Sequence, residues 1–344
     1  MTHACSACCC WVSRRLDGMS KLIQGASWGR RRCLAALSLL ALPSARAQGD
    51  SLRIIVGFPP GGGADYVARL LAEQLKDQFG APVIVDNRPG AGGVVAASVF
   101  MQSNPDGRTL ILASDHMLSV VPMTIAKPGY DPARDFLAVG TVALGETAFA
   151  VHPHKGVKTL GDYAAWLRAH PNDDVAGIPA PGSAPEFIVA LLSKLLGNSL
   201  RPVPYRGGMP LIQDLIAGQI PAGLATAGEL FAHHQAGRVR MLGVTGARRM
   251  PLLPEVPTFG ELGLAGLEHS TYLALFTRSG TPAPTVAKLN QALRATLDNP
   301  KMREGLTKLS MTPLHESAEE LAVRRDRSVA AWTRIIKSSG YLPQ

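Results

Sequence analysis

Residues 54–65 read Ile-Ile-Val-Gly-Phe-Pro-Pro-Gly-Gly-Gly-Ala-Asp, an apolar run that ends in a loop with three consecutive glycines. Apolar residues then recur at helical spacing over residues 67–79, and Gly80 closes the expected helix. A strand that leads through a glycine-rich loop into an amphipathic helix is typical of α/β folds. Because glycine has no Cβ atom, this loop can turn tightly and let its backbone approach a bound molecule.

The start of this helix is a candidate anion site. Its first turn leaves backbone N–H groups unpaired, and the positive end of the helix dipole points the same way. A carboxylate or phosphate fits there without a lysine. A tight turn alone would also explain the glycines, so the loop by itself leaves both interpretations open. Asp65 lies in the first turn, and we expect it to stabilise the helix rather than to contact a ligand.

Short apolar runs and helical segments alternate along the rest of the chain. Residues 82–85 and 109–113 read as two more strands, which with residues 52–57 predict a parallel, doubly wound first lobe. A second lobe is expected from residues 149–152 onward. Its expected elements are helices over residues 160–169, 186–196 and 210–217 and strands near Val203, Gly223 and Met241. Residues 272–277 read as a strand that returns to the first lobe, before helices over residues 285–299 and 318–338.

This order predicts two α/β lobes, each with a mainly parallel sheet flanked by helices, joined by a hinge of two crossing strands. Residues 48–147 and 271–344 are assigned to lobe 1, and residues 148–270 to lobe 2. Two lobes on a two-strand hinge place a ligand in the cleft between them.

The first 47 residues read as an export signal. Three arginines at residues 30–32 precede an apolar run over residues 33–42, and Ala45 and Ala47 are small residues of the kind that a signal peptidase recognises. The run is shorter than the ~20 residues that cross a bilayer. We expect cleavage after Ala47 and export to the periplasm, with Met19 as an alternative start. A buried helix of a globular domain is the other interpretation of this run.

Cleavage would change the charge and the cysteine content of the chain. It removes seven basic residues and one acidic residue from the 35 and 26 of the full chain, so the net charge falls from +9 to +3. No run of lysine and arginine remains to indicate nucleic-acid binding. All five cysteines also lie before the cut, which suits an oxidising compartment.

Motifs for catalysis, cofactors and metals are weak. The glycine loop does not read G-x-G-x-x-G, and the chain after residue 47 has neither a Walker lysine nor a G-x-S-x-G elbow. Ser114, Asp115 and His116 are the residue types of a catalytic triad, but neighbouring side chains on an extended segment point to opposite sides and cannot form one. His152 and His154 could face the same way as metal ligands, although a solvated edge is favoured without a carboxylate or cysteine nearby. We therefore expect no catalytic set, no metal and no cofactor.

Six motifs follow one another in a characteristic order. After residues 54–65 come Val-Asp-Asn-Arg-Pro-Gly-Ala-Gly-Gly (85–93), Asn-Pro-Asp-Gly-Arg-Thr-Leu (104–110), Tyr-Asp-Pro-Ala-Arg-Asp-Phe (130–136), Val-Pro-Tyr-Arg-Gly (203–207) and Leu-Pro-Glu-Val-Pro-Thr (253–258). With these motifs the chain resembles the Bug-type substrate-binding proteins of the tripartite tricarboxylate transporter family over nearly all of its length after residue 47.

The resemblance implies a periplasmic receptor with a type II-like periplasmic-binding-protein fold. Its two lobes would close like a Venus flytrap on a small carboxylate and deliver it to the membrane permease subunits of a transporter. It also implies a monomer without enzymatic activity. Carried onto this sequence, the ligand contacts come from Phe58, Pro59, Gly61, Gly62, Gly63 and Ala64, from Ser114, Asp115, His116 and Met117, and, in lobe 2, from Gly182, Ser183, Ala184, Tyr205, Arg206, Gly207, Thr226 and Ala227.

Two positions depart from the family pattern. Glu186 stands where a histidine is common, and Ala225-Thr226-Ala227 replaces a polar pair. A ligand anion beside Glu186 would be repelled unless a cation offsets it. The hypothesis is that Glu186 belongs to the site and favours a ligand with an amine or an aromatic tail, so that Glu186→Gln would change ligand preference. Arg206 is the better candidate for a cation that contacts the ligand, because Arg88 is expected to brace its own turn.

Two other functions remain open at this point. A sensor of the same fold would pass its ligand-bound form to a membrane signalling protein instead of a transporter. An exported α/β enzyme that acts on an organic acid is the third interpretation, which the missing nucleophile, metal and acid–base sets disfavour.

Overall fold

The computed structural model describes residues 51–153, 156–268, 270–339 and 341. The expected export signal over residues 1–47 and the expected position of His154 lie outside these residues. Within them, no helix combines the length and the apolar character that a membrane crossing requires.

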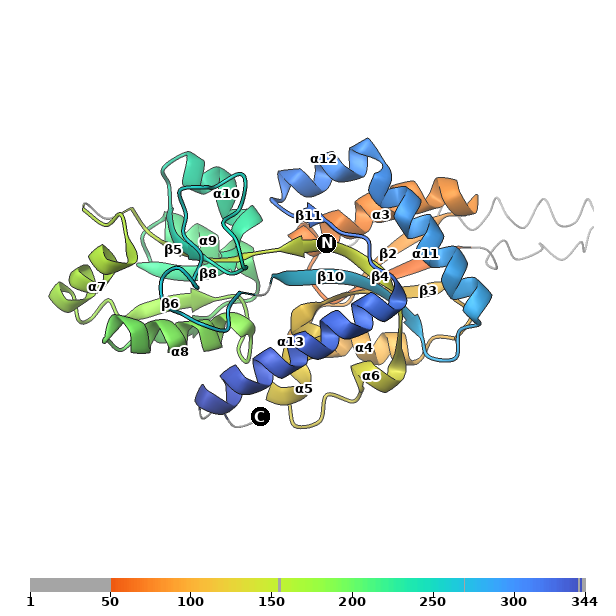
Figure 1. Ribbon diagram of the computed structural model, residues 1–344, viewed down its shortest axis with the longest axis horizontal. Helices are drawn as coiled ribbons and strands as arrows, with labels where there is room; N and C mark the ends of the chain where they lie inside the picture. Colours follow the sequence, from red (N-terminus) through yellow and green to blue (C-terminus); the bar gives the residue numbers. More distant parts are fainter. Residues whose placement is uncertain (1–50, 154–155, 269, 340, 342–344) are drawn as a thin grey trace, which may run out of the picture. The chain divides into compact units, whose positions relative to one another are not determined.

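A six-stranded sheet forms the core of lobe 1 (Figure 1). Its strand order is β11-β4-β10-β3-β1-β2. The strands are β1 (Leu52–Val56), β2 (Val83–Asn87), β3 (Thr109–Ser114), β4 (Phe136–Gly145), β10 (Thr271–Arg278) and β11 (Thr312–Pro313). Strands β2, β1 and β3 are parallel, whereas β10 pairs antiparallel with both β3 and β4.

A five-stranded sheet in the order β7-β6-β8-β5-β9 forms the core of lobe 2. The strands are β5 (Thr147–Val151), β6 (Val175–Ile178), β7 (Arg201–Pro204), β8 (Ala222–Thr226) and β9 (Arg240–Val244). Strands β7, β6 and β8 are parallel, and β5 is antiparallel to both of its neighbours. The expected two-lobe α/β fold is confirmed, with one refinement: each sheet is mixed, with a parallel half and an antiparallel half.

Helices cover both faces of each sheet because successive strand residues point to opposite sides. In lobe 1, Ile54 packs with the face under α3, α11 and α12, and Ile55 packs with the face under α4. In lobe 2, one face carries α7 and α8 and the other α9 and α10. The helices are α3 (Gly63–Phe79), α4 (Val94–Met101), α5 (Val121–Thr124), α6 (Pro132–Asp135), α7 (Leu160–Ala169), α8 (Ala184–Leu196), α9 (Gly208–Ile216), α10 (Ala227–Gln235), α11 (Ala283–Asp298), α12 (Pro300–Lys308) and α13 (Ala318–Ser339).

The chain passes between the lobes where the hinge is expected. Strand β4 ends at Gly145 and β5 begins at Thr147, so Glu146 is the whole of the first crossing. The second crossing leads from the end of β9 to the start of β10 at Thr271. Strands β4 and β10 are neighbours in one sheet, and β5 and β9 are neighbours in the other. The two crossings therefore start and end at neighbouring strands in both sheets.

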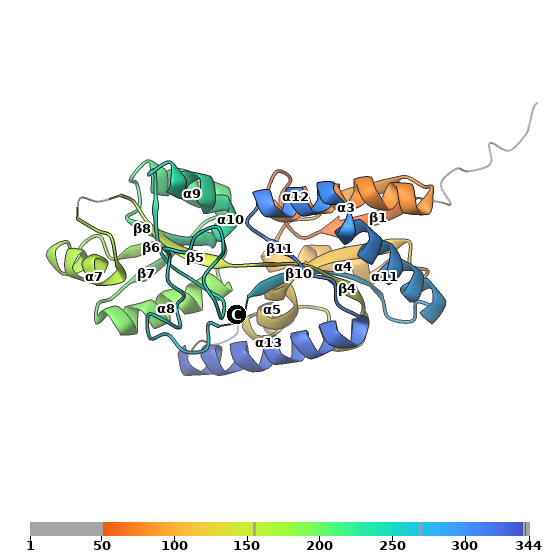
Figure 2. The same ribbon diagram turned by 45° about the horizontal axis from the view of Figure 1, so that its top comes forward.

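The C-terminal helix α13 contributes to both lobes. Its N-terminal half contacts β4, whereas Trp332, Ile335 and Ile336 near its end are buried in the core of lobe 2 against α8 (Figure 2). The ring of Tyr341 then meets that of Phe187 edge to face, with the centroids 5.3 Å apart. The last part of the segment assigned to lobe 1 by sequence thus packs into lobe 2.

Candidate functional site

The glycine loop between β1 and α3 is held in shape by Asp65. The Asp65 carboxylate is buried, and it accepts hydrogen bonds from the Gly61 backbone N–H (2.9 Å), Arg69 Nε (2.9 Å) and Asn87 Nδ2 (3.0 Å). Burial alone would raise the pKa of this carboxyl, but the hydrogen bonds and the charge of Arg69 outweigh burial and keep the pKa below its usual value. The expectation that Asp65 has a structural role is confirmed.

The start of α3 offers backbone amides that its own side chains do not cap. Gly62 is the N-cap residue and makes no side-chain cap hydrogen bond. Gly61 has a φ of 86°, a conformation that glycine adopts readily. A Cβ atom at Gly61 or Gly63 would meet nothing within 4 Å, so the loop is open on the side from which a ligand would approach.

A second acid lies at the helix starts of lobe 2. Glu229 is in the first turn of α10, and Thr226 Oγ1 donates a hydrogen bond to Glu229 Oε2 (2.8 Å). The backbone of Gly208, the first residue of α9, packs so closely that a Cβ atom there would lie 2.6 Å from Glu229 Oε2. The starts of α9 and α10 thus converge on one carboxylate.

Burial raises the pKa of Glu229, and the hydrogen bonds from Thr226 and Gly63 oppose that shift. Glu229 is not among the residues expected from the sequence. A threonine followed three positions later by a glutamate is a helix-capping pattern, but nothing in that pattern indicates that the start of α9 packs against the carboxylate.

In lobe 2, the loop before α8 corresponds to the glycine loop, and a glutamate of α8 accepts a hydrogen bond from one of its backbone amides. Glu186 Oε2 accepts a hydrogen bond from the backbone N–H of Gly182 (2.6 Å), and Ser183 Oγ donates to the carbonyl of Ala180 (2.6 Å). Ser183 and Ala184 are buried. Glu186 therefore does for this loop what Asp65 does for the glycine loop, with a glycine amide four residues upstream as the partner in each.

The segment Ser114–His116 corrects one expectation. Asp115 is 1% exposed, and its carboxylate accepts hydrogen bonds from Ser119 Oγ (2.8 Å), Ser328 Oγ and Trp332 Nε1 (3.1 Å). These hydrogen bonds hold α13 in place, so we assign Asp115 a structural role in place of the expected ligand contact. The reason is that a polar side chain after a strand can point inward as easily as outward.

The neighbours of Asp115 do not form a catalytic set with it. Ser114 Oγ accepts a weak hydrogen bond from the Met117 backbone N–H (3.4 Å). Burial lowers the pKa of His116 to about 4, so its imidazole is neutral at pH 7. The expectation that these three side chains diverge is met. Among the described residues, no group of three or more His, Cys, Asp or Glu is placed to hold a metal ion.

The remaining expected residues of lobe 2 lie around the start of α9 and α10. Tyr205 donates its hydroxyl to Asp214 Oδ2 (2.8 Å), and burial together with this carboxylate raises the pKa of Tyr205 to about 12. Arg206 is exposed, and Gly207 takes a φ of 107° immediately before α9. Thr226 caps α10, because its side chain accepts from the Glu229 backbone N–H, and the Tyr205 hydroxyl is turned toward α9.

A carboxyl group also lies in the hinge itself. Glu146 Oε2 accepts a hydrogen bond from Thr245 Oγ1 (2.6 Å), and Glu146 Oε1 accepts one from Ser270 Oγ. Glu146 is the first crossing, and Ser270 ends the second. Burial raises the pKa of Glu146 to about 7, against the opposing effect of the two hydroxyl groups.

This pKa predicts a pH dependence of stability. The ordinary value is 4.5, so between pH 4.5 and 7 the folded protein holds a proton that the unfolded chain has released. The free energy of unfolding should fall as the pH rises through this window, by about 1–2 kcal/mol for a partly buried group. Glu146→Gln should remove this slope. Thermal unfolding at pH 5 and pH 8 checks it, and parallel losses in the variant and the parent would contradict it.

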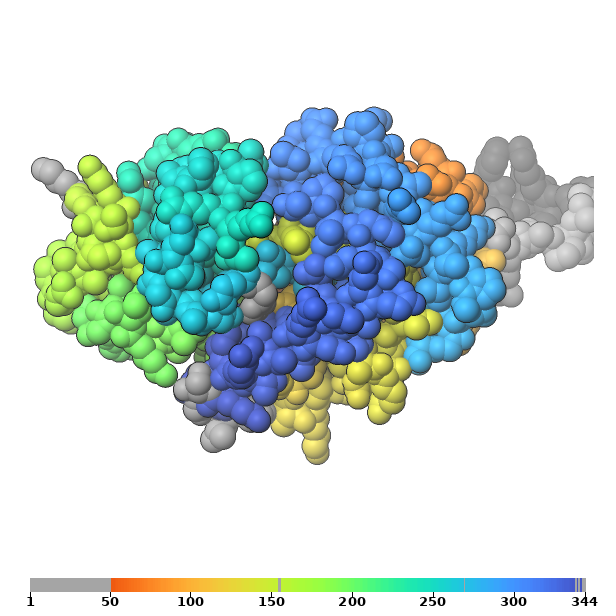
Figure 3. Space-filling view, in the orientation of Figure 1, coloured from red at the N-terminus to blue at the C-terminus, as the bar shows by residue number. Residues whose placement is uncertain are grey.

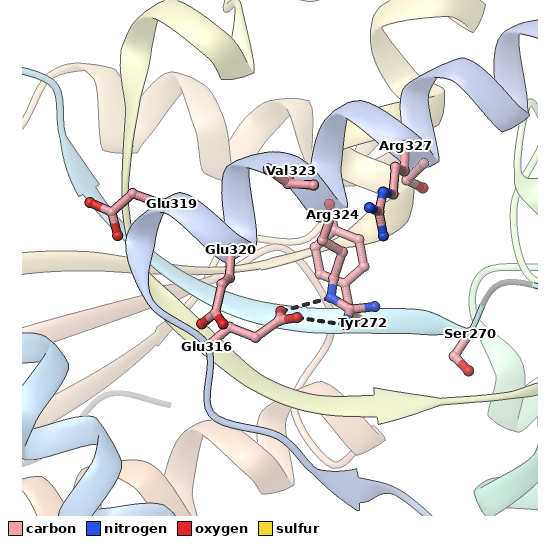
Figure 4. Close-up of a pocket in the computed structure, with 9 residues that line it drawn as sticks. Ser270, Tyr272, Glu316, Glu319, Glu320, Val323, Arg324 and Arg327 are labelled. Carbon is pink, nitrogen blue, oxygen red and sulfur yellow. Dashed lines mark hydrogen bonds and ion pairs between the residues drawn. The ribbon is translucent and has the colours of Figure 1, made fainter.

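A cavity of about 530 Å³ lies beside the hinge, between β10 and α13. Its lining includes Tyr272, Glu319 and Arg327, and Arg324 forms a two-bond ion pair with Glu316 (2.6 and 2.7 Å) (Figure 4). None of the ligand contacts expected from the sequence lines this cavity.

Known proteins resemble this chain over most of its length. The model of a family described as "Tripartite tricarboxylate transporter family receptor" matches residues 67–341. A Pseudomonas protein described as "UPF0065 protein in tcbD-tcbE intergenic region" is 30% identical over 325 residues, which cover 92% of this chain and 96% of the relative.

Two solved structures are similar in both sequence and fold. Periplasmic binding protein BugD is 28% identical, with a TM-score of 0.77 over 86% of this chain and 99% of that protein. Rpa4515 of R. palustris, solved with adipate, is 28% identical, with a TM-score of 0.79 over 86% of this chain and 98% of that protein.

Proposed function

The chain belongs to the tripartite tricarboxylate transporter family of receptors, and on this premise we propose that it binds a small organic acid between its lobes and delivers it to membrane permease subunits. Family and fold are those of periplasmic binding proteins, not of enzymes. One observation carries the proposed site: the start of α3 has backbone amides without a side-chain cap, beside a glycine loop that is open at Gly61 and Gly63. A ligand carboxylate would use the same backbone amides.

Binding in this proposal is coupled to the closure of the lobes. The glycine loop belongs to lobe 1, whereas Thr226, Arg206 and the start of α9 belong to lobe 2. A ligand that contacts both lobes favours the closed arrangement by the free energy of those added contacts. Arg206, exposed beside Gly207, is our candidate for a cation that reaches the ligand. We also propose export to the periplasm, with cleavage after Ala47, and function as a monomer.

A thermal-shift screen tests the proposal. The chain from Gln48 onward is heated with dicarboxylates, tricarboxylates, amino acids and aromatic acids in turn. A ligand at a hundred times its dissociation constant should add about 2.7 kcal/mol of stability, a shift of a few degrees. We expect at least one acid to give this shift and to be recovered unchanged after incubation.

Mass spectrometry of the denatured protein provides the control, because a tightly held ligand could survive purification and hide the shift. The absence of both a shift and a retained acid would contradict the proposed receptor function. Conversion of the bound acid into a product would instead indicate an enzyme.

A further inference from the structure

The cavity of about 530 Å³ between β10 and α13, which we call the hinge cavity, has no part in the proposed function. Ser270 and Tyr272 line one side of it, at the start of β10, and α13 lines the other (Figure 4). Its volume falls within the range of about 300–1,000 Å³ that is typical of small-molecule sites. None of the contacts expected for the acid in the cleft lines it, so an occupant would be a second ligand.

Apolar surface lines the middle of the hinge cavity. Tyr272 is 2% exposed, and its ring stands between β10 and α13 (Figure 4). Val323 on α13 is half exposed and lines the same space. These two side chains can pack against the hydrocarbon part of a bound molecule, and a site of this kind needs only a few polar groups to fix its ligand.

The charged groups of the hinge cavity follow one face of α13. Glu320, Arg324 and Arg327 are spaced by four and three residues, so their side chains are neighbours along the helix. Arg324 already donates from Nε and Nη2 to the carboxylate of Glu316 (2.7 and 2.6 Å). With that pair neutralised, the charges left for a ligand are Glu320 at one end of the face and Arg327 at the other (Figure 4).

Both of these groups keep free hydrogen-bonding capacity. Glu320 Oε2 accepts a hydrogen bond from the Ser317 backbone N–H (2.8 Å), which leaves Oε1 available. Arg327 is exposed and forms neither an ion pair nor a hydrogen bond within the part of the chain that the structure describes. The two residues lie seven positions apart, about 10 Å along the helix. A negative and a positive group at this separation, with apolar surface between them, complement a molecule that carries opposite charges at its two ends.

We propose that the hinge cavity is a second ligand site, which takes a small zwitterion whose ammonium and carboxylate groups are separated by an apolar chain. The carboxylate pairs with Arg327 and the ammonium with Glu320, while the chain lies against Tyr272 and Val323. A diacid would place a carboxylate beside Glu320, and a diamine would place an ammonium beside Arg327, so each would be repelled at one end. This site is independent of the acid proposed for the cleft.

The test uses three probes with equal chains: 6-aminohexanoate, adipate and 1,6-diaminohexane. Their dissociation constants are measured by titration calorimetry at pH 7.5 for the parent chain and for two variants. Arg327→Gln and Glu320→Gln, which keeps an acceptor for Ser317, should each weaken the binding of 6-aminohexanoate by ~10-fold, because each removes a hydrogen bond between charged groups. A diacid in the same cavity would lose affinity only in Arg327→Gln, and a diamine only in Glu320→Gln.

Arg334→Gln provides the matched control. Arg334 is exposed on α13, seven residues after Arg327, and does not line the hinge cavity. This variant changes the net charge by the same amount and should bind 6-aminohexanoate as the parent does. Binding of the probe in the cleft would survive both cavity variants, so a dissociation constant that neither of them changes would overturn the site.

The remaining outcomes separate the class of ligand from the site and from the receptor function. Sensitivity to Arg327→Gln that is confined to adipate, or sensitivity to Glu320→Gln that is confined to 1,6-diaminohexane, would overturn the zwitterion as the ligand. A negative thermal-shift screen with the acids of the cleft would contradict the receptor function, whereas the loss of 6-aminohexanoate binding in both cavity variants would still support the second site.

Discussion

Asp115→Ala is expected to lower the free energy of unfolding by about 3–5 kcal/mol, because three buried donors then lose the carboxylate to which they donate. Ser119 lies one helical turn after Asp115, but Ser328 and Trp332 lie on α13, more than 200 positions further along the chain. The carboxylate therefore fixes the helix that packs against both lobes. Thermal unfolding should report a midpoint lower by roughly 10 °C.

Asp174→Ala provides the control for this loss. Asp174 is likewise a hydrogen-bonded carboxylate, but its partner Arg201 is largely exposed, and exposed ion pairs contribute about 0–1 kcal/mol. Asp115→Asn provides a second control, since it keeps an acceptor for Trp332 and should bind ligand below its unfolding temperature with unchanged affinity. A midpoint for Asp115→Ala equal to that of Asp174→Ala would refute the structural role, and lost binding by a folded Asp115→Asn would restore Asp115 to the ligand site.

Most of the elements could be predicted from the sequence because apolar periodicity fixes them locally. The helix over residues 160–169 has the predicted bounds. The direction of the strands was harder to predict: β10 lies between β3 and β4 and runs antiparallel to both. The direction in which a strand enters a sheet depends on contacts with distant residues, and alternating hydrophobicity carries no record of it.

The backbone of the candidate site was predictable from the sequence, but the roles of its acidic side chains were not. Three glycines before a helix identify an open loop whatever surrounds it. Asp115, Glu186 and Glu229 look alike in the sequence, as acids close to expected cleft loops. Their roles depend on what each carboxylate reaches: α13 for Asp115, its own loop for Glu186 and the start of α9 for Glu229. Only the packing of distant elements decides among these.

Gly228→Ala is expected to weaken ligand binding by ~10- to 100-fold, since overpacking costs ~1–3 kcal/mol and each ~1.4 kcal/mol is a factor of ten. Gly228, in the first turn of α10, faces the backbone of Leu309 just after α12. In the space-filling view, lobe 2 adjoins the blue C-terminal part of the chain (Figure 3). A Cβ atom at residue 228 would lie 1.7 Å from the Leu309 carbonyl oxygen. That carbonyl cannot easily give way, because the Leu309, Ser310 and Met311 amides are all hydrogen-bonded within the same turn.

The added methyl group must therefore push lobe 2 away from lobe 1 while each lobe keeps its own core. The unfolding midpoint of the ligand-free protein should change little, and the loss should appear only in calorimetric titration with the acid found by thermal shift. Gly161→Ala is the matched control: Gly161 is likewise the second residue of a lobe 2 helix, and a Cβ atom there meets only Thr159 Oγ1 at 3.7 Å. Equal affinities of the two variants would mean that the acid binds without the contact between Gly228 and Leu309, and that the closed arrangement of the lobes is not the binding state.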